Sequence, residues 1–450
     1  MTKFPQDPSP PPIGDDGSNV NHQSQPMNSE SAHDPALGVL QPQDSVTEDN
    51  VETTVSVAGA LGPVASESVG DLLEAAEVPA GKDVRPGDSL TAAPTGAPII
   101  PGLHRERYLP NTHVVVVGGG PIGLWIAWYS ALHGAKVTVI DDEKNPTYLV
   151  AAGWCFPYHS TDPVAVPWSI ESARMWALHE PYLPEGAVRR EHTRVERSAK
   201  AAPFPAEYAK LPGYRALTSD ELSPGMKSGF ESESLVIPAQ IWHPAMRRTL
   251  ESLGVVWVKR HIATVDEFED LQVKLEANFV VDAMGIFSAF VFDDPKFKPL
   301  RGTVLDFVLP ENYEHGVRSW DLERGDYQDP YAVPLRSLGI LRVGGETQPI
   351  SQAHAEALIE GGCKPDSNVV SALYERAIEF MPELTEMEYI GAHTGVRPSR
   401  DRLLLGFHPG KARSILHASG AGGAGITLAP KIGHEVVSSM IDVRSQWKGC

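Results

Sequence analysis

The sequence is poor in cysteine and has no long apolar run, and both absences exclude whole classes of protein. Only three cysteines occur in 450 residues. Their number is odd and none shows the C-x-x-C spacing, so we predict free thiols rather than a disulfide framework or a zinc site. No apolar run approaches the roughly 20 residues that cross a bilayer. The histidines show no metal-ligand spacing, and no metal is expected.

Basic residues are also scarce relative to acidic ones. The net charge of −20 argues against nucleic acid or an anionic membrane as a partner, because a polyanion would be repelled. The N-terminus lacks the basic start and apolar segment of a secretory signal. The C-terminal residues are not a peroxisomal address of the S-K-L type. We therefore expect a cytoplasmic protein, and we leave open whether it is a homodimer.

Aromatic residues are almost missing before residue 105. Pro, Ser, Asp and Gly dominate there, as in FPQDPSPPPIGDDGSN, and such segments bury too little apolar surface to offset chain entropy. We predict that residues 1–105 form a disordered, acidic Pro/Ser-rich tail. The stretch SVGDLLEAAEVPA at 68–80 is amphipathic, and we interpret it either as a solvated linker with a transient helix or as a segment that folds on a partner.

The first ordered segment is HVVVVGGGPIGLWIAWYSALHGAKVTVIDDE. The β-branched runs at 114–117 and 137–140 predict two strands, and residues 121–133 predict a helix that ends at Gly134. An acid follows the second strand, with Asp141 the first choice and Asp142 the second for binding an adenosine ribose. The sequence therefore predicts a dinucleotide-binding unit, without distinguishing FAD from NAD.

The glycine spacing between this strand and helix has a physical purpose. Gly118 permits a tight turn, Gly120 lets a pyrophosphate approach the backbone, and Gly123 lets the helix pack on the strand. The helix N-terminus adds N–H groups and a partial positive charge. The predicted phosphate-binding residues are Gly118, Gly120, Pro121, Ile122 and Gly123.

A second glycine turn, SGAGGAGITLAP at 419–430, lies near the other end of the chain. A strand-like segment precedes it, and a helix running to about Met440 follows, with Pro430 expected in its first turn. The exposed N–H groups of such a turn suit an anion or a developing negative charge. Two such turns far apart in sequence indicate one long cofactor that is bound from both ends, and FAD is long enough.

Seven segments, in order between about residues 110 and 442, resemble the D-amino-acid oxidase family, which includes D-aspartate oxidase. They are VVVVGGGPIGL, VAAGWCFPYHSTDP, SLGVVWVKRHI, VVDAMGIFS, GDYQDPYAVP, GVRPSRDRLLL and HASGAGGAGITL. The resemblance implies an α/β (α+β two-domain) fold: a glutathione-reductase-like Rossmann FAD-binding domain with a mixed-sheet substrate domain. The expected FAD-binding domain is 106–300, with part of the substrate domain inserted at about 165–230. The expected substrate domain is 301–389, and the chain returns to the FAD-binding domain at 390–450.

The same resemblance implies further contacts with FAD, made by the backbone. Ile262 would contact the adenine. The flavin ring would lie beside Ala151, Ala152 and Gly153, and its pyrimidine edge would face the N–H groups of Gly422, Gly423, Ala424, Gly425, Ile426 and Thr427.

For the substrate, the resemblance implies a carboxylate clamp at Arg397, a hydroxyl from Tyr331, a gate at Tyr327 and an amine acceptor in the carbonyl of Gly423. A guanidinium fork matches a carboxylate as a lysine does not. Two alternatives stay open: the tyrosines belong to the core, or Arg397 forms a structural salt bridge. Arg400 is open between a cofactor contact and an ion pair.

The function implied is FAD-dependent oxidative deamination of a D-amino acid by hydride transfer from Cα to the flavin N5. It would yield an imino acid, then a 2-oxo acid and ammonia, with O2 as electron acceptor and H2O2 as by-product. The alternatives are an FAD-dependent oxidase of another amine (glycine, an N-methyl amino acid or a biosynthetic intermediate) and a non-catalytic flavoprotein.

Departures from the family pattern motivate the first of these alternatives, an oxidase of another amine. Trp154, Cys155, Phe156 and Ser419 replace the common pocket residues, and a Tyr-Leu-Val run at 148–150 replaces a hydroxyl-bearing phosphate loop. Arg318 stays open between a site for an acidic substrate side chain and a solvated residue. An unpaired buried arginine would penalise apolar substrates.

Overall fold

A computed structural model describes residues 107–144, 146–157, 164–201, 203–322, 329–409 and 414–447. The predictions for residues 1–105, including the segment at 68–80, and for Tyr327 lie outside these ranges. In the part of the chain that is described, no helix is both long and apolar enough to span a bilayer.

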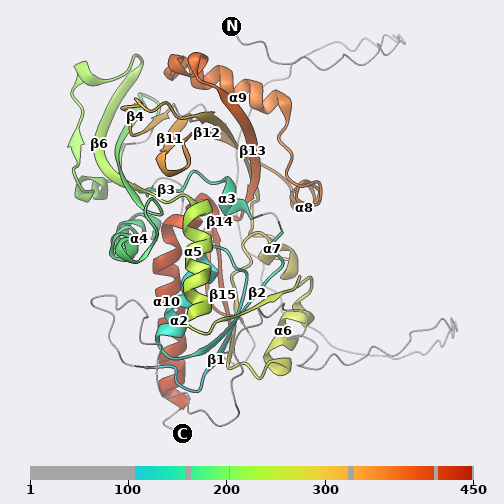
Figure 1. The fold of residues 1–450 in the computed structure, drawn as a ribbon. Helices are drawn as coiled ribbons and strands as arrows, with labels where there is room; N and C mark the ends of the chain where they lie inside the picture. Colours follow the sequence, from blue (N-terminus) through green and yellow to red (C-terminus); the bar gives the residue numbers. More distant parts are fainter. Residues whose placement is uncertain are drawn as a thin grey trace, which may run out of the picture. The chain divides into compact units, whose positions relative to one another are not determined.

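The first of two sheets (Figure 1) has six strands in the order β14-β15-β8-β1-β2-β7. Five run parallel, and β14 is an antiparallel edge strand. The strands are β1 (His113–Val117), β2 (Lys136–Asp141), β7 (Val256–Lys259), β8 (Phe279–Asp282), β14 (Ser399–Phe407) and β15 (Ile415–Ala421). Parallel strands covered on both faces are expected to be apolar throughout, and all five residues of β1 are buried.

Helices cover both faces of this sheet. Val114 and Val116 of β1 belong to one core cluster, together with helices α2, α4, α5 and α10. Val115 and Val117 belong to another, together with α6, because successive side chains of a strand point to opposite faces. The helices are α2 (Pro121–Leu132), α4 (Ala165–His179), α5 (Ala239–Ser252), α6 (Val265–Lys274), α7 (Phe287–Val291) and α10 (Gly425–Trp447). The order strand, glycine turn, helix, strand is as predicted.

The second sheet has nine strands in the order β13-β9-β12-β11-β10-β4-β6-β3, with β5 paired to β6. The sheet is mixed: β10 runs parallel to β4, and the other strand pairs of the sheet are antiparallel. Its strands are β3 (Trp154–Cys155), β4 (Arg189–Ser198), β5 (Arg215–Ala216), β6 (Met226–Val236), β9 (Leu300–Val308), β10 (Val317–Asp321), β11 (Tyr331–Leu335), β12 (Ile340–Pro349) and β13 (Tyr389–Arg397). The two sheets match the expected α/β architecture.

Three further helices accompany the second sheet (Figure 1). They are α3 (Thr147–Val150), α8 (Gln352–Glu360) and α9 (Ser367–Phe380). Leu373 and Ala377 of α9 pack on Phe307 and Leu341 of the sheet. The opposite face of the sheet is directed toward α3 and the first sheet.

The borders between the sheets differ from the expected domain limits. Helix α4 lies in the expected insertion at 165–230 but packs in the core of the first sheet, and β6 continues to Val236. Strand β13 lies beyond the expected return at 390, yet it pairs with β9. The chain changes sheets at Pro398, between β13 and β14. Apolar patterning identifies a strand but does not show which sheet it joins.

Four tryptophans fill the core between the helices of the first layer: Trp125, Trp128, Trp176 and Trp242. The rings of Trp125 and Trp176 lie 5.1 Å apart, and those of Trp176 and Trp242 lie 4.9 Å apart, both edge to face. Burying each ring contributes on the order of 2–3 kcal/mol.

Pro430 is placed differently from the prediction. Helix α10 begins at Gly425, so Pro430 falls in its second turn and cannot donate to the carbonyl four residues earlier. That carbonyl, of Ile426, accepts the indole Nε1–H of Trp176 at 3.1 Å instead. The tryptophan core thus satisfies the group that the proline leaves open.

We predict that His179 makes the protein sensitive to mild acid. Its ring lies 4.3 Å from that of Trp125, and burial lowers its pKa to about 4 although its hydrogen bond to the Met175 carbonyl opposes the shift. The histidine of the unfolded chain takes up a proton near pH 6.5, whereas the buried ring does so only near pH 4. Between these two pH values protonation favours the unfolded state, so the stability that the neutral ring allows is complete above pH 6.5 and is lost as the pH falls toward 4. The unfolding free energy of the wild type should fall between pH 7.5 and pH 5, and in His179→Phe this fall should be smaller by about 2 kcal/mol.

Urea unfolding followed by tryptophan fluorescence measures this difference. His354→Gln, at an exposed ring on α8, serves as the control and should leave the pH dependence unchanged. Equal pH dependence in wild type and His179→Phe would contradict the prediction.

Candidate active site

The turn after β1 requires glycine at two positions for packing. Gly118 has φ +108°, and an added Cβ would lie 2.3 Å from the Ala283 carbonyl oxygen. A Cβ on Gly123 would lie 1.9 Å from the carbonyl oxygen of Gly118. Gly120 differs, because a Cβ there would meet only Tyr148 at 3.7 Å. Its missing side chain leaves room in the cavity in front of the N-terminus of α2.

Asp141 and Asp142 follow β2 but have different partners. A Cβ on Gly119 would lie 2.4 Å from Oδ2 of Asp141, so this carboxylate adjoins the glycine turn. Burial is the main cause that raises the pKa of Asp141. Asp142 instead accepts a hydrogen bond from His261 Nδ1 at 2.6 Å. Of the two, Asp141 is better placed for a ribose bound beside the turn.

The second glycine turn leads from β15 into α10. Gly420 and Gly422 have positive φ of +85° and +54°, and the Gly422 N–H donates to the Pro398 carbonyl at 3.0 Å. Thr427 donates from Oγ1 to the Trp154 carbonyl at 3.5 Å. The N-termini of α2 and α10 border the same cavity, which Pro121 and Ile122 line from one helix and Gly425 from the other.

This cavity has a volume of about 1210 Å³ and extends between the two sheets. It brings together most of the sequence-predicted residues. Those that line it are Gly118, Gly120, Pro121, Ile122, Asp141, Asp142, Ala151, Ala152, Gly153, Ile262, Tyr331, Arg397, Gly422, Gly423, Gly425, Ile426 and Thr427. Gly123 and Ala424 do not line it: Gly123 packs on Gly118, and Ala424 is buried in the core.

Trp154 lines one wall of the cavity, and Phe156 lies behind it in the core. Trp154 and Phe156 stack at 4.8 Å with an interplanar angle of 12°. Trp154 donates from Nε1 to Ser234 Oγ at 3.1 Å, which holds the ring in place. Before Trp154, Gly153 has φ +67°, and a Cβ there would lie 2.2 Å from the Ile237 carbonyl oxygen.

Arg397 ends strand β13 on the cavity side. Its guanidinium lies over Gly302, where an added Cβ would be 2.6 Å from its Cζ, and its Nη1 donates to Thr347 Oγ1. Among the described residues, no carboxylate forms an ion pair with Arg397. The salt-bridge alternative for Arg397 therefore finds no partner in this part of the chain.

Tyr331 lies in the same cavity. Its ring covers Gly344 on the neighbouring strand, where a Cβ would be 2.2 Å from Cζ, and its centroid lies 6.3 Å from that of Trp154. Tyr327, the expected gate, lies outside the described residues.

Arg318 is not in the cavity, which corrects the hypothesis that it binds an acidic substrate side chain. It pairs in register with Ala332, whereas Tyr331 pairs with Ser319, so Arg318 and Tyr331 face opposite sides of the sheet. Its guanidinium forms an ion pair with Glu383 and donates to Tyr313 Oη at 2.9 Å. Nor is it solvated, because its side chain is only 14 % exposed.

Two of the remaining polar side chains have defined partners. Arg400 lines the cavity and forms an ion pair with Asp294 at 3.0 Å. His243 donates from Nε2 to the Gly119 carbonyl at 2.7 Å, and its ring stacks on that of Tyr148 at 4.6 Å. Sequence reasoning missed the contact of His243 with Gly119 because 124 positions separate the two residues and His243 belongs to no motif.

Comparison with known proteins identifies the fold. A family model described as FAD dependent oxidoreductase (DAO) matches residues 113–439. The chain belongs to this family. FAD is accordingly its cofactor, and the cavity fits it: the open side of Gly120, the carboxylate of Asp141 and two helix N-termini all border one space.

Several solved structures share the fold. Glycine oxidase from Geobacillus kaustophilus aligns with a TM-score of 0.58 at 19% identity over 74% of this chain and 95% of that one. L-amino acid deaminase from Proteus vulgaris gives 0.57 at 12% over 76% and 94%. L-alpha-glycerophosphate oxidase from Mycoplasma pneumoniae with FAD bound gives 0.54 at 14% over 73% and 94%. Identities this low establish the fold alone.

We predict that Gly120→Ala separates folding from FAD binding. The φ of −73° at Gly120 suits alanine, so the variant should fold normally. Its methyl group would enter the space in front of α2, and FAD affinity should fall about tenfold or more, equivalent to at least 1.4 kcal/mol. Fluorescence titration with FAD measures the change.

The matched control is Gly391→Ala, in a strand of the second sheet, where an added Cβ meets nothing within 4 Å. It should bind FAD as wild type does. Wild-type FAD affinity in Gly120→Ala would show that the cofactor does not approach this turn.

Proposed function

We propose that this DAO-family oxidoreductase oxidises an amine that carries a carboxylate, with a D-amino acid as substrate and O2 as electron acceptor. The observation that supports this most directly is Arg397: a half-buried guanidinium in the cofactor cavity that has no carboxylate partner among the described residues. A substrate carboxylate would complete its hydrogen bonding.

We assign the cofactor contacts from the residues that line the cavity together with the resemblance to the D-amino-acid oxidase family. The glycine turn at 118–123 and the N-terminus of α2 would hold the pyrophosphate, and Asp141 would accept hydrogen bonds from the ribose. Ile262 would contact the adenine. The segments 151–153 and 422–427 would flank the flavin ring.

When bound, FAD supplies an acceptor for a hydride from the substrate Cα. Arg397 and Tyr331 would fix the carboxylate, and the Gly423 carbonyl would accept a hydrogen bond from the amine. Holding the reactants in one orientation can itself contribute up to about 7–11 kcal/mol, so a side-chain base is not required. The overall reaction converts the amino acid, O2 and water into a 2-oxo acid, ammonia and H2O2.

A second candidate, oxidation of glycine or another small amine, is favoured by the aromatic wall. Trp154 is only 5% exposed and is held by both Phe156 and Ser234. A rigid wall of this kind limits the side chain that a substrate can carry. The structure of Arg318 removes the support for acidic D-amino acids.

Anaerobic absorbance spectra of the purified protein test the proposal. D-alanine should bleach the flavin and its L-enantiomer should not, because Arg397 and the Gly423 carbonyl would fix two of the substituents on Cα and the transferred hydride must face the flavin. Bleaching by glycine alone would favour the second candidate. A flavin that no amino acid or small amine bleaches would contradict both and favour a non-catalytic flavoprotein.

We predict that Arg397→Met lowers the rate of bleaching at subsaturating substrate roughly 100-fold, from the loss of two charge-assisted hydrogen bonds. FAD affinity should stay within about twofold of wild type, since Arg397 belongs to the substrate side of the cavity. Arg397→Lys, which keeps the charge but not the fork, should recover only part of the rate. Equal rates in wild type and Arg397→Met would remove the carboxylate clamp from the proposal.

A further inference from the structure

Arg342 extends a buried guanidinium from the second sheet to helix α3. It lies in β12 and is 2% exposed. Its Nη1 donates to the carbonyls of Leu149 and Val150 at 3.1 Å each and of Ala151 at 3.0 Å. These are carbonyls at the C-terminus of α3, which a helix leaves without internal partners and where a cation is favoured.

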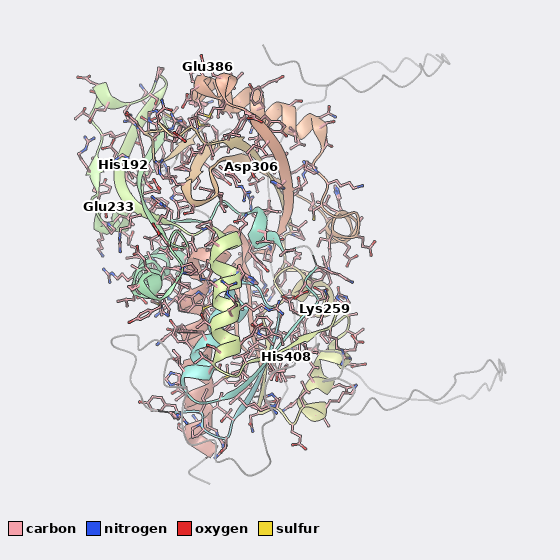
Figure 2. The ribbon with its side chains drawn as sticks, viewed as in Figure 1. His192, Glu233, Lys259, Asp306, Glu386 and His408 are labelled. Carbon is pink, nitrogen blue, oxygen red and sulfur yellow. The ribbon has the colours of Figure 1, made fainter. Side chains whose placement is uncertain are left out.

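Asp306 fixes the orientation of this guanidinium. Nε of Arg342 donates to Oδ1 at 2.8 Å and Nη2 donates to Oδ2 at 2.7 Å, a two-point contact from the neighbouring strand β9. His393 Nε2 lies 3.2 Å from Oδ2. Burial alone would raise the pKa of Asp306, but its hydrogen bonds to Arg342 and His393 outweigh burial and hold that pKa below its usual range. Asp306 lies above α3 in Figure 2.

Helix α3 depends on such contacts because it cannot hold its own position. It is a single turn, none of its residues is buried, and Leu149 is exposed. An isolated turn of helix is unstable in water. Besides Arg342, Gln240 donates from Nε2 to the Leu149 carbonyl at 2.8 Å.

The carbonyls held by Arg342 lead directly into the segment 151–153, which lines the cavity. The far end of this segment is fixed by Gly153, whose carbonyl accepts the Ile237 N–H at 2.8 Å. Arg342 fixes the near end. Every residue from 149 to 153 lines the cavity, so displacement of α3 would change its shape.

We propose that Arg342, oriented by Asp306, is a positioning residue for FAD: it fixes residues 149–153 and so sets the affinity of the protein for the cofactor and the environment of the flavin ring. This rests on the proposed location of the ring beside residues 151–153. It does not depend on which amine is the substrate.

The test compares three variants of the full chain. Arg342→Met removes the contact but leaves the buried Asp306 with only the exposed His393 as a partner, which can itself destabilise the fold. Arg342→Met/Asp306→Leu removes both charges and avoids that penalty. Arg342→Lys keeps a charge but not the fork. The matched control is Arg318→Met/Glu383→Leu, which removes an ion pair from the opposite face of the same sheet.

Release of FAD from the diluted holoprotein, followed by flavin fluorescence, gives the dissociation constant, and the visible spectrum of bound flavin reports on the ring. We expect the dissociation constant to rise about tenfold or more in Arg342→Met/Asp306→Leu, together with a shifted spectrum. Arg342→Lys should be intermediate, and the control should stay within about twofold of wild type.

A wild-type dissociation constant and spectrum in Arg342→Met/Asp306→Leu would overturn the proposal. An equal loss of FAD in the control would also overturn it, because the effect would then follow from any lost ion pair of the sheet. The proposed amine oxidase function is tested by a different result: it is contradicted when no amine bleaches the wild-type flavin.

Discussion

The site depends on two helix N-termini at one edge of one parallel sheet. Strands β1 and β15 both run parallel to β8, which lies between them. Each ends in a glycine turn and continues into a helix on the same face, so the N-termini of α2 and α10 come close together. Two strand spacings separate β1 from β15, about 10 Å. A long anionic cofactor can therefore meet both partial positive charges.

This constraint explains why the two glycine turns lie so far apart in sequence. A parallel sheet needs a crossover between neighbouring strands, and here the crossovers also contain strands of the second sheet. The turn at 118–123 and the turn at 419–425 become neighbours only when β8 is inserted between their strands. The second sheet can then cover the cavity from the other side, with Arg397 and Tyr331 on its inner face.

Local spacing predicted the parts of the site that lie within one motif. The glycine turn, helix α2, strand β2 and Asp141 form one continuous unit, and their roles follow from positions a few residues apart. The sequence did not predict contacts between separate elements: His243 of α5 with the Gly119 carbonyl, or Asp282 with His417 at 2.8 Å and His417 with His408 at 2.8 Å. The sequence also left open which face of the second sheet Arg318 occupies. A shift of one residue in strand pairing moves a side chain to the opposite face.

One strand of the second sheet carries a residue that acts on the proposed cofactor site and another that acts on the proposed substrate site. Arg342 and Thr347 both lie in β12: the first holds the segment beside the expected flavin ring, and the second accepts a hydrogen bond from Arg397. Between them the register shifts at a β-bulge between Val343 and Glu346. A bulge of this kind redirects the side chains that follow it. The position of β12 therefore couples the segment at 149–153 to Arg397, so that in the proposed function cofactor and substrate would share one support.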